Sequence, residues 1–123
     1  MKHFLLAVGI VFIVGAIAIV IETQLHPLGR MYNNYVLDGS DPYKKCSQLP
    51  IFSDAERIVK ANEQELLALK KFDNGIIWDV WPMCDGQKGE LRIIYGSHNT
   101  RLEVEKVIKN NDFHGVPTAL INT

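Results

Sequence analysis

The longest hydrophobic run of the chain lies at its N-terminus. Residues 4–21 read FLLAVGIVFIVGAIAIVI and contain no charged or polar side chain. A helix of this length is about 27 Å long, which is close to the roughly 30 Å hydrocarbon core of a bilayer. The run has no polar face that a soluble partner layer would leave exposed. We therefore expect residues 1–22 to form a single-pass transmembrane signal-anchor helix.

Two other interpretations of this run stay open. Lys2 precedes it, and Ala16-Ile17-Ala18 matches the small-residue pattern of a signal-peptide cleavage site, so cleavage near Ala18 would give a secreted protein. The run is longer than the about 7–15 apolar residues usual for a signal peptide, which favours the anchor. A buried helix in a soluble core is the third interpretation.

Residues 23–50 show no long periodic pattern and are predicted to be a tether with turns. Pro27, Gly29, the asparagine pair at 33–34, DGSDP at 38–42 and Pro50 all interrupt regular structure there. The segment 34–38 is a candidate short strand that would extend the sheet of the following domain.

Residues 51–123 carry the alternating patterns of a folded domain. SDAE at 53–56 matches a capping box, so a helix is predicted to begin at Ser53; its apolar stripe is interrupted at Asn62 and it ends before residues 73–75, DNG. GIIWDVW (75–81) and ELRIIYG (90–96) are rich in β-branched and aromatic residues, which predicts two strands joined by a turn.

The pairing of these two strands can be derived from their side chains. If Trp81 lies opposite Glu90, then Val80 meets Leu91, and one face of the hairpin is apolar. The other face then places Asp79 opposite Arg92, which we expect to form an ion pair, and Ile77 opposite Ile94. A register that gives both a core face and a charge pair is strongly specified.

A second helix is predicted to start within 97–100, and a last strand near 116–121. TRLE at 100–103 is another capping-box match, and we interpret GSHNTR at 96–101 as helix capping rather than as an anion site assisted by Arg101. Pro117 has no amide proton for a ladder, so the last strand should be an edge or begin late. The expected fold class is α+β: a two-layer α/β sandwich in the order α-β-β-α-β, with a three-stranded mixed sheet and a possible fourth short strand.

The charge balance of the chain argues against a nucleic-acid partner. The chain has 13 Lys and Arg against 14 Asp and Glu, a formal net charge of −1. A nucleic-acid-binding domain normally shows a basic surface, so no nucleic-acid partner is expected.

The two cysteines admit several interpretations. Cys46 precedes the first domain helix and Cys84 lies in the turn between the strands, so the topology should bring them to one end of the domain. A Cys46–Cys84 disulfide is the expectation we favour, and it suits an extracytoplasmic domain because disulfides persist in oxidising compartments. The alternative is a copper or zinc site of Cys46, Cys84 and His114, with Met83 or Asp85 nearby, although no C-x-x-C motif supports it. A catalytic thiol or two free structural thiols are the remaining options.

The outer face of the hairpin is the candidate partner surface. It carries Ile77, Asp79, Trp81, Arg92 and Ile94, an apolar patch with a charged centre of the kind that docks other proteins. The tether could instead fold over this face.

These patterns favour a non-enzymatic function. We expect a membrane-anchored binding or accessory protein that presents its domain outside the cytoplasm to another protein or membrane complex, without a cofactor and with no catalytic residue identified. The alternative is a membrane-tethered domain that handles thiols or metal through Cys46, Cys84 and His114.

Overall fold

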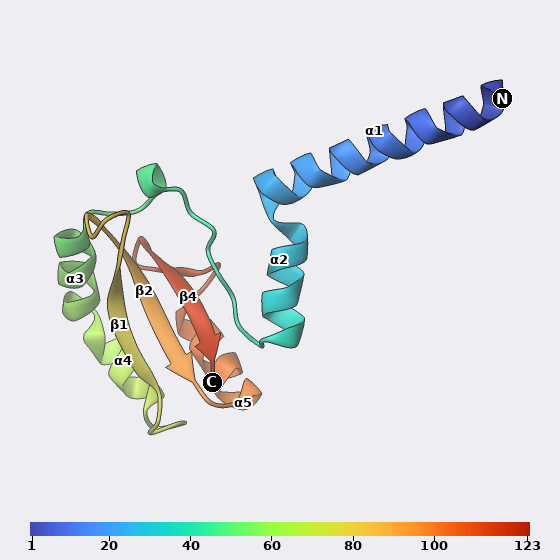
Figure 1. Ribbon diagram of the computed structural model, residues 1–123. Helices are drawn as coiled ribbons and strands as arrows, with labels where there is room; N and C mark the ends of the chain where they lie inside the picture. Colours follow the sequence, from blue (N-terminus) through green and yellow to red (C-terminus); the bar gives the residue numbers. More distant parts are fainter.

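A computed structural model of the protein describes the backbone of residues 1–123 and the side chains of all of them except residues 22–25 and 27. Helix α1 (Lys2–Leu25) projects away from the rest of the chain (Figure 1). Its stretch Lys2–Ile21 has a mean hydropathy of 3.2, and none of it is buried inside the protein. The predicted N-terminal apolar helix is therefore present. Its length and composition suffice to cross a membrane, and a signal sequence shares these properties.

The chain turns sharply after α1. His26 has a left-handed backbone (φ 50°), and a short helix α2 (Pro27–Met31) follows and continues into the π-helical turn η1 (Tyr32–Val36). The predicted strand at 34–38 is thus wrong, because these residues remain in or next to helical turns, with the Leu37 amide donating to the Tyr32 carbonyl at 3.1 Å. We call residues 26–46 the connecting segment.

The connecting segment joins the sheet two residues later than the sequence suggested. Ser40 forms an isolated antiparallel bridge with Leu120, in which each amide donates to the other's carbonyl at 2.7–2.8 Å. Gly39 makes this approach possible, since a Cβ there would lie 2.5 Å from the Leu120 carbonyl oxygen.

The sheet has four strands in the order β1-β2-β4-β3. Strands β1 (Ile77–Met83) and β2 (Lys88–Tyr95) are antiparallel, β2 and β4 (Val116–Asn122) are parallel, and the two-residue β3 (Asp112–Phe113) is antiparallel to β4. The predicted α+β fold with a mixed sheet is confirmed, but its fourth short strand is β3 and not the expected segment 34–38.

The predicted hairpin register is confirmed along its whole length, from Ile77 opposite Ile94 to Trp81 opposite Glu90. The face toward the helices is apolar and buried, since Val80, Leu91 and Ile93 have almost no exposed surface. Pro117 is not on an edge, because β4 lies between β2 and β3, but the pairing of β4 with β2 begins only at Thr118, after the proline.

Helices α3 (Phe52–Ala61), α4 (Glu63–Leu69) and α5 (His98–Val107) form the second layer on one face of the sheet (Figure 1). Asn62 separates α3 from α4, and its side-chain amide donates to the Ile58 carbonyl at 2.9 Å. The buried core lies between the layers and consists of Ala55, Val59, Leu66, Leu69, Ile76, Val80, Leu91, Ile93, Tyr95, Val104, Ile108, Phe113, Val116 and Leu120.

Both predicted capping boxes are wrong in detail. Helix α3 begins at Phe52, one residue before Ser53, because the Phe52 amide donates to the Gln87 carbonyl at 3.0 Å and so fixes the start of the helix against the hairpin turn. Helix α5 is capped by Ser97, whose Oγ accepts from the Thr100 amide at 3.1 Å, and not by Thr100.

The two cysteines are joined by a disulfide. Cys46 lies in the 3-10 turn η2 (Cys46–Gln48) at the end of the connecting segment, and Cys84 lies in the β1–β2 turn, with a Cα–Cα distance of 6.1 Å. The bond therefore holds the end of the connecting segment against the hairpin.

Removing this disulfide should destabilise the domain. For a sequence separation of 38 residues, Cys46→Ala with Cys84→Ala should lower the free energy of unfolding by about 2–4 kcal/mol, because the open chain gains conformational freedom when unfolded. Guanidinium titration of the full chain in detergent, followed by tryptophan fluorescence, measures the change. The exposed neighbour Ser47→Ala is the control. Alkylation of both thiols without a reductant would contradict the closed bond.

Candidate partner surface

The face of the hairpin that points away from α3–α5 is largely open. Ile77, Asp79 and Trp81 of β1 project from it beside Arg92 and Ile94 of β2. The Ile77 side chain is 56% exposed and Trp81 is 48% exposed, whereas Arg92 and Ile94 are half-buried. All five residues of the predicted partner surface therefore lie on one face, and the connecting segment leaves the two large apolar groups of β1 accessible.

Arg92 occupies the centre of this face, but its interactions differ from those expected. Its guanidinium lies 4.6 Å from the centroid of the Trp81 ring, and its Nε lies 3.5 Å from Glu90 Oε1. Although Asp79 is directly opposite in the ladder, no ion pair of Asp79 is formed among the residues whose side chains are described. The long Arg92 side chain instead runs diagonally across the ladder to Trp81. There it makes a cation–π contact with the indole ring and an ion pair with the Glu90 carboxylate.

Glu90 is the buried acid of this face. Only 4% of it is exposed, and its Oε1 makes no hydrogen bond within the described part of the chain. Burial raises the pKa of Glu90, and the negative charge of Asp41 raises it further, while Arg92 acts in the opposite direction. A carboxylate in this position costs folding free energy at neutral pH.

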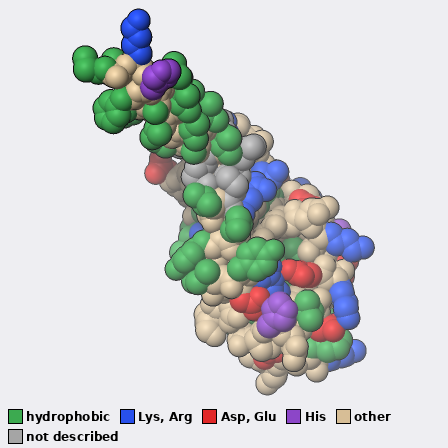
Figure 2. Space-filling model, turned by 90° about the vertical axis from the view of Figure 1, so that its right-hand side faces the viewer, with side chains coloured by type: hydrophobic (Ala, Val, Ile, Leu, Met, Phe, Trp, Pro, Cys, Tyr) green, Lys and Arg blue, Asp and Glu red, His purple; other side chains and the backbone are tan. Residues whose placement is uncertain are grey.

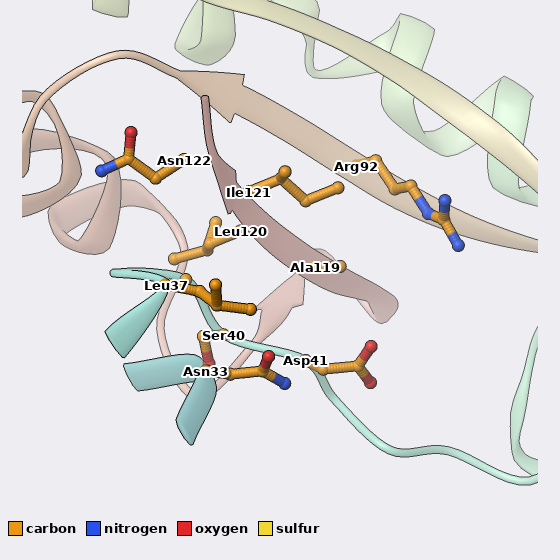
Figure 3. Close-up of a pocket in the computed structure, with 10 residues that line it drawn as sticks. Asn33, Leu37, Ser40, Asp41, Arg92, Ala119, Leu120, Ile121 and Asn122 are labelled. Atoms are coloured by element: carbon orange, nitrogen blue, oxygen red, sulfur yellow. The ribbon is translucent and has the colours of Figure 1, made fainter. Parts of the chain in front are cut away.

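A cavity of about 270 Å³ adjoins Arg92 on the β4 side of the face. Figure 3 shows Leu37, Ser40 and Asp41 of the connecting segment on one side of it and strand β4 with Ala119 and Ile121 on the other. The connecting segment thus covers the β4 part of the sheet and leaves a hollow that continues the open face.

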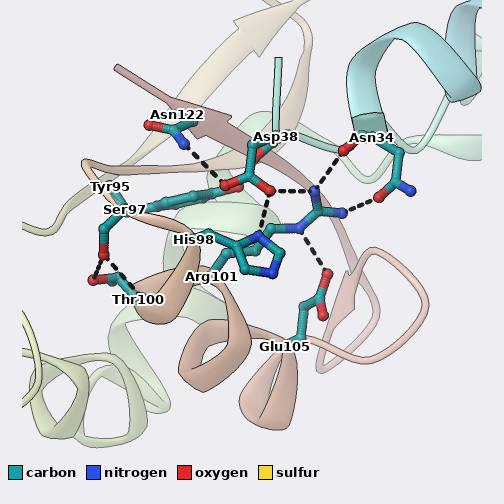
Figure 4. Close-up of polar contacts among 9 residues, drawn as sticks. All are labelled: Asn34, Asp38, Tyr95, Ser97, His98, Thr100, Arg101, Glu105 and Asn122. Atoms are coloured by element: carbon teal, nitrogen blue, oxygen red, sulfur yellow. Dashed lines mark hydrogen bonds and ion pairs between the residues drawn. The ribbon is translucent and has the colours of Figure 1, made fainter. Parts of the chain in front are cut away.

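The connecting segment is held to the domain by a cluster of polar residues around Arg101, which we call the Arg101 cluster (Figure 4). Arg101 projects from α5, and only 5% of it is exposed. Its Nε donates to Glu105 at 2.9 Å, and its Nη1 donates to Asp38 Oδ1 at 2.9 Å and to the Asn34 carbonyl at 3.1 Å. Its Nη2 donates to the Asn34 side chain. Every partner except Glu105 belongs to the connecting segment.

Asp38 is the second centre of the Arg101 cluster. Its carboxylate accepts from Arg101, lies 2.8 Å from His98 Nδ1, and accepts from the Asn122 amide at 2.9 Å. Burial alone would raise the pKa of Asp38, but the hydrogen bonds from His98, Arg101 and Asn122 lower it below its ordinary value. The Tyr95 hydroxyl donates to the Asp38 carbonyl, and burial raises the pKa of Tyr95 to about 12.

The residues of the metal hypothesis do not gather into a ligand set. The sulfur atoms of Cys46 and Cys84 are bonded to each other, and His114 Nε2 lies 2.9 Å from Glu65 Oε1. Among the residues with described side chains, no three His, Cys, Asp or Glu side chains form a group that could hold a metal ion.

No pattern in the sequence predicted the Arg101 cluster. Arg101 stood out only as a possible anion contact, and Asp38 only as part of a turn. The one available signal was the i,i+4 spacing of Arg101 and Glu105 within the predicted helix. Comparisons of the chain with protein-family models, with curated proteins and with solved structures found no match.

Loss of the Arg101 guanidinium should release the connecting segment. Arg101→Met leaves Asp38 and Glu105 without their cation, and we expect a loss of about 2–3 kcal/mol, less than for a fully buried pair because both carboxylates are partly exposed. Amide hydrogen exchange of residues 34–41 should accelerate. Arg57→Met, which removes an exposed pair with Asp54, is the matched control and should change little. Unchanged exchange at 34–41 would show that the segment is held elsewhere.

The buried acid gives a pH-dependent effect with a definite sign. Because folding raises the pKa of Glu90, the folded state binds the proton more tightly, and stability falls as pH rises through that pKa. Glu90→Gln should therefore stabilise the protein at neutral pH, and this gain should shrink as pH falls below the ordinary value of 4.5. Denaturant titrations at neutral pH and below pH 4.5 measure the change in the free energy of unfolding, with Glu56→Gln at an exposed position as control. An equal gain at both pH values would exclude this origin.

Proposed function

We propose that the protein is a single-pass membrane-anchored binding or accessory protein that presents its α+β domain outside the cytoplasm to another protein of the same membrane. Helix α1 supports the anchor, since a stretch of this hydropathy lies entirely exposed and needs an apolar environment. The disulfide supports the extracytoplasmic side.

One observation supports the partner surface above all others. Ile77 and Trp81 remain about half exposed on a face whose central Arg92 is already packed against Trp81. Tryptophan and arginine are the residue types that dominate binding energy at interfaces, and a pre-ordered aromatic–cation pair loses little entropy on binding.

The same face indicates what kind of segment would bind. Asp79 is exposed between Ile77 and Trp81 and has no ion pair among the described side chains. A partner segment with apolar side chains for Ile77 and Trp81, and a lysine or arginine for Asp79, is complementary to this surface.

Fewer observations support the alternative function, which is thiol or metal chemistry by Cys46, Cys84 and His114. Such chemistry needs thiolates, which a closed disulfide removes, and His114 is engaged by Glu65. We therefore propose binding rather than catalysis.

Photo-crosslinking tests the proposed surface. A benzophenone amino acid placed at Ile77 in the full chain, in membranes of the source organism, should give one adduct of discrete mass. The same group at Leu102, which is 47% exposed on α5, should give none. Asp79→Lys should abolish the Ile77 adduct while the protein stays folded at the crosslinking temperature, although the lysine opposite Arg92 should lower the thermal unfolding midpoint modestly. Equal adducts at both positions, or an adduct that survives Asp79→Lys, would argue against this face.

A further inference from the structure

The short helical segment that follows α1 has an exposed apolar stripe. Met31, Tyr32, Tyr35 and Val36 are between 55% and 78% exposed. Residues 31 and 35, and 32 and 36, are four positions apart, so they lie on one side of α2 and η1. We call these four residues the α2–η1 stripe.

The opposite side of the same segment carries polar residues that bond to α5 and to a later part of the connecting segment. Asn33 donates to the Tyr43 hydroxyl at 2.7 Å, and the Asn34 carbonyl and side chain accept from Arg101. Because these bonds fix the rotation of the segment about its axis, the stripe cannot turn inward to the core. It faces outward as a consequence of the fold.

The stripe points away from the domain, because the opposite side of its segment is bonded to Arg101. α1 leaves the end of α2 on the side away from the sheet, at the bend formed by His26 (Figure 1). Figure 2 views the molecule from that side, and hydrophobic side chains lie on the neck of the molecule below the root of α1. The surface of a bilayer crossed by α1 would therefore lie next to the stripe.

Cationic side chains lie elsewhere on the connecting segment, and one of them, Arg30, has its guanidinium 5.4 Å from the centroid of the Tyr43 ring. Arg30, Lys44 and Lys45 are exposed and line one cleft between α2 and the end of the connecting segment, whose acidic lining residues are Asp41 and Glu90. Exposed cations near a segment that lies at a phospholipid surface can meet anionic headgroups there.

We propose that α2 and η1 form a second membrane contact, in which the α2–η1 stripe lies in the interfacial layer of the bilayer that α1 crosses. Tyr32 and Tyr35 suit this layer, since tyrosine concentrates at the boundary between lipid and water. The domain is then held at the bilayer surface in one orientation, because the Arg101 cluster joins it to the other side of the same segment. This inference rests on the proposed function, since it requires α1 to be inserted.

Spin-label accessibility in the full chain tests the inference. Single substitutions Ile10→Cys, Tyr35→Cys and Lys60→Cys are labelled without reductant, so that the native disulfide stays closed, and the protein is placed in nanodiscs of phosphatidylcholine and phosphatidylglycerol. Ile10 reports on α1, Tyr35 on the stripe, and Lys60 on the exposed side of α3. The ratio of collisions with oxygen, which enters lipid, to collisions with a water-soluble nickel chelate should be severalfold higher at Ile10 and Tyr35 than at Lys60. Val36→Cys repeats the measurement on the stripe.

The outcomes separate the inference from its premise. A lipid-like ratio at Ile10 with an aqueous ratio at Tyr35 and Val36 would overturn the second contact and leave the anchor intact. A label at Tyr35 shielded from both reagents would also overturn it, since a protein would then cover the stripe. An aqueous ratio at Ile10 would overturn the proposed anchor and this inference together.

Discussion

The interaction on which the rest of the molecule depends is the neutralisation of the buried Arg101 guanidinium. A buried cation is tolerated only when anions and carbonyl oxygens surround it, and helix α5 supplies just one of these, from Glu105. The others come from Asn34 and Asp38 of the connecting segment. The folded domain therefore includes Asn34 and Asp38, which belong to the segment predicted from the sequence to be a tether. The position of α2, the cover over Glu90 and the cavity beside Arg92 all follow from where this segment is fixed.

The connecting segment is fixed at three points along its length. The Arg101 cluster holds its first part, the Ser40–Leu120 bridge holds its middle on β4, and the Cys46–Cys84 disulfide holds its end at the hairpin turn. These points lie along the β4 side of the sheet and the turn, so the segment cannot also cover β1. The open area around Ile77 and Trp81 is a consequence of that path, as is the burial of Glu90.

Local and periodic features of this fold could be predicted from the sequence, and long-range polar ones could not. The hairpin register follows from the alternation in residues 76–95, because only one pairing places Val80 and Leu91 on the same face as the core. The start of α3 could not be predicted, because the Gln87 carbonyl in a distant turn determines it. The predicted Asp79–Arg92 ion pair is not formed. The register fixes only the backbone positions, and the long Arg92 side chain reaches Trp81 and Glu90 instead. The Arg101 cluster joins residues 63 positions apart, and no local pattern signals such a contact.

The two proposed contacts lie on different parts of the domain, and this constrains the partner. Strand β1 is one edge of the sheet, and of the three strands labelled in Figure 1 it lies farthest from α2, so the edge with Ile77 and Trp81 is on the far side from the α2–η1 stripe. If the stripe rests on the bilayer, a partner that binds β1 must do so with a part that extends beyond the membrane surface. A partner held wholly within the bilayer could contact α1 but not Trp81. We therefore expect the partner to be a membrane protein with an extracytoplasmic domain or loop that reaches past the sheet.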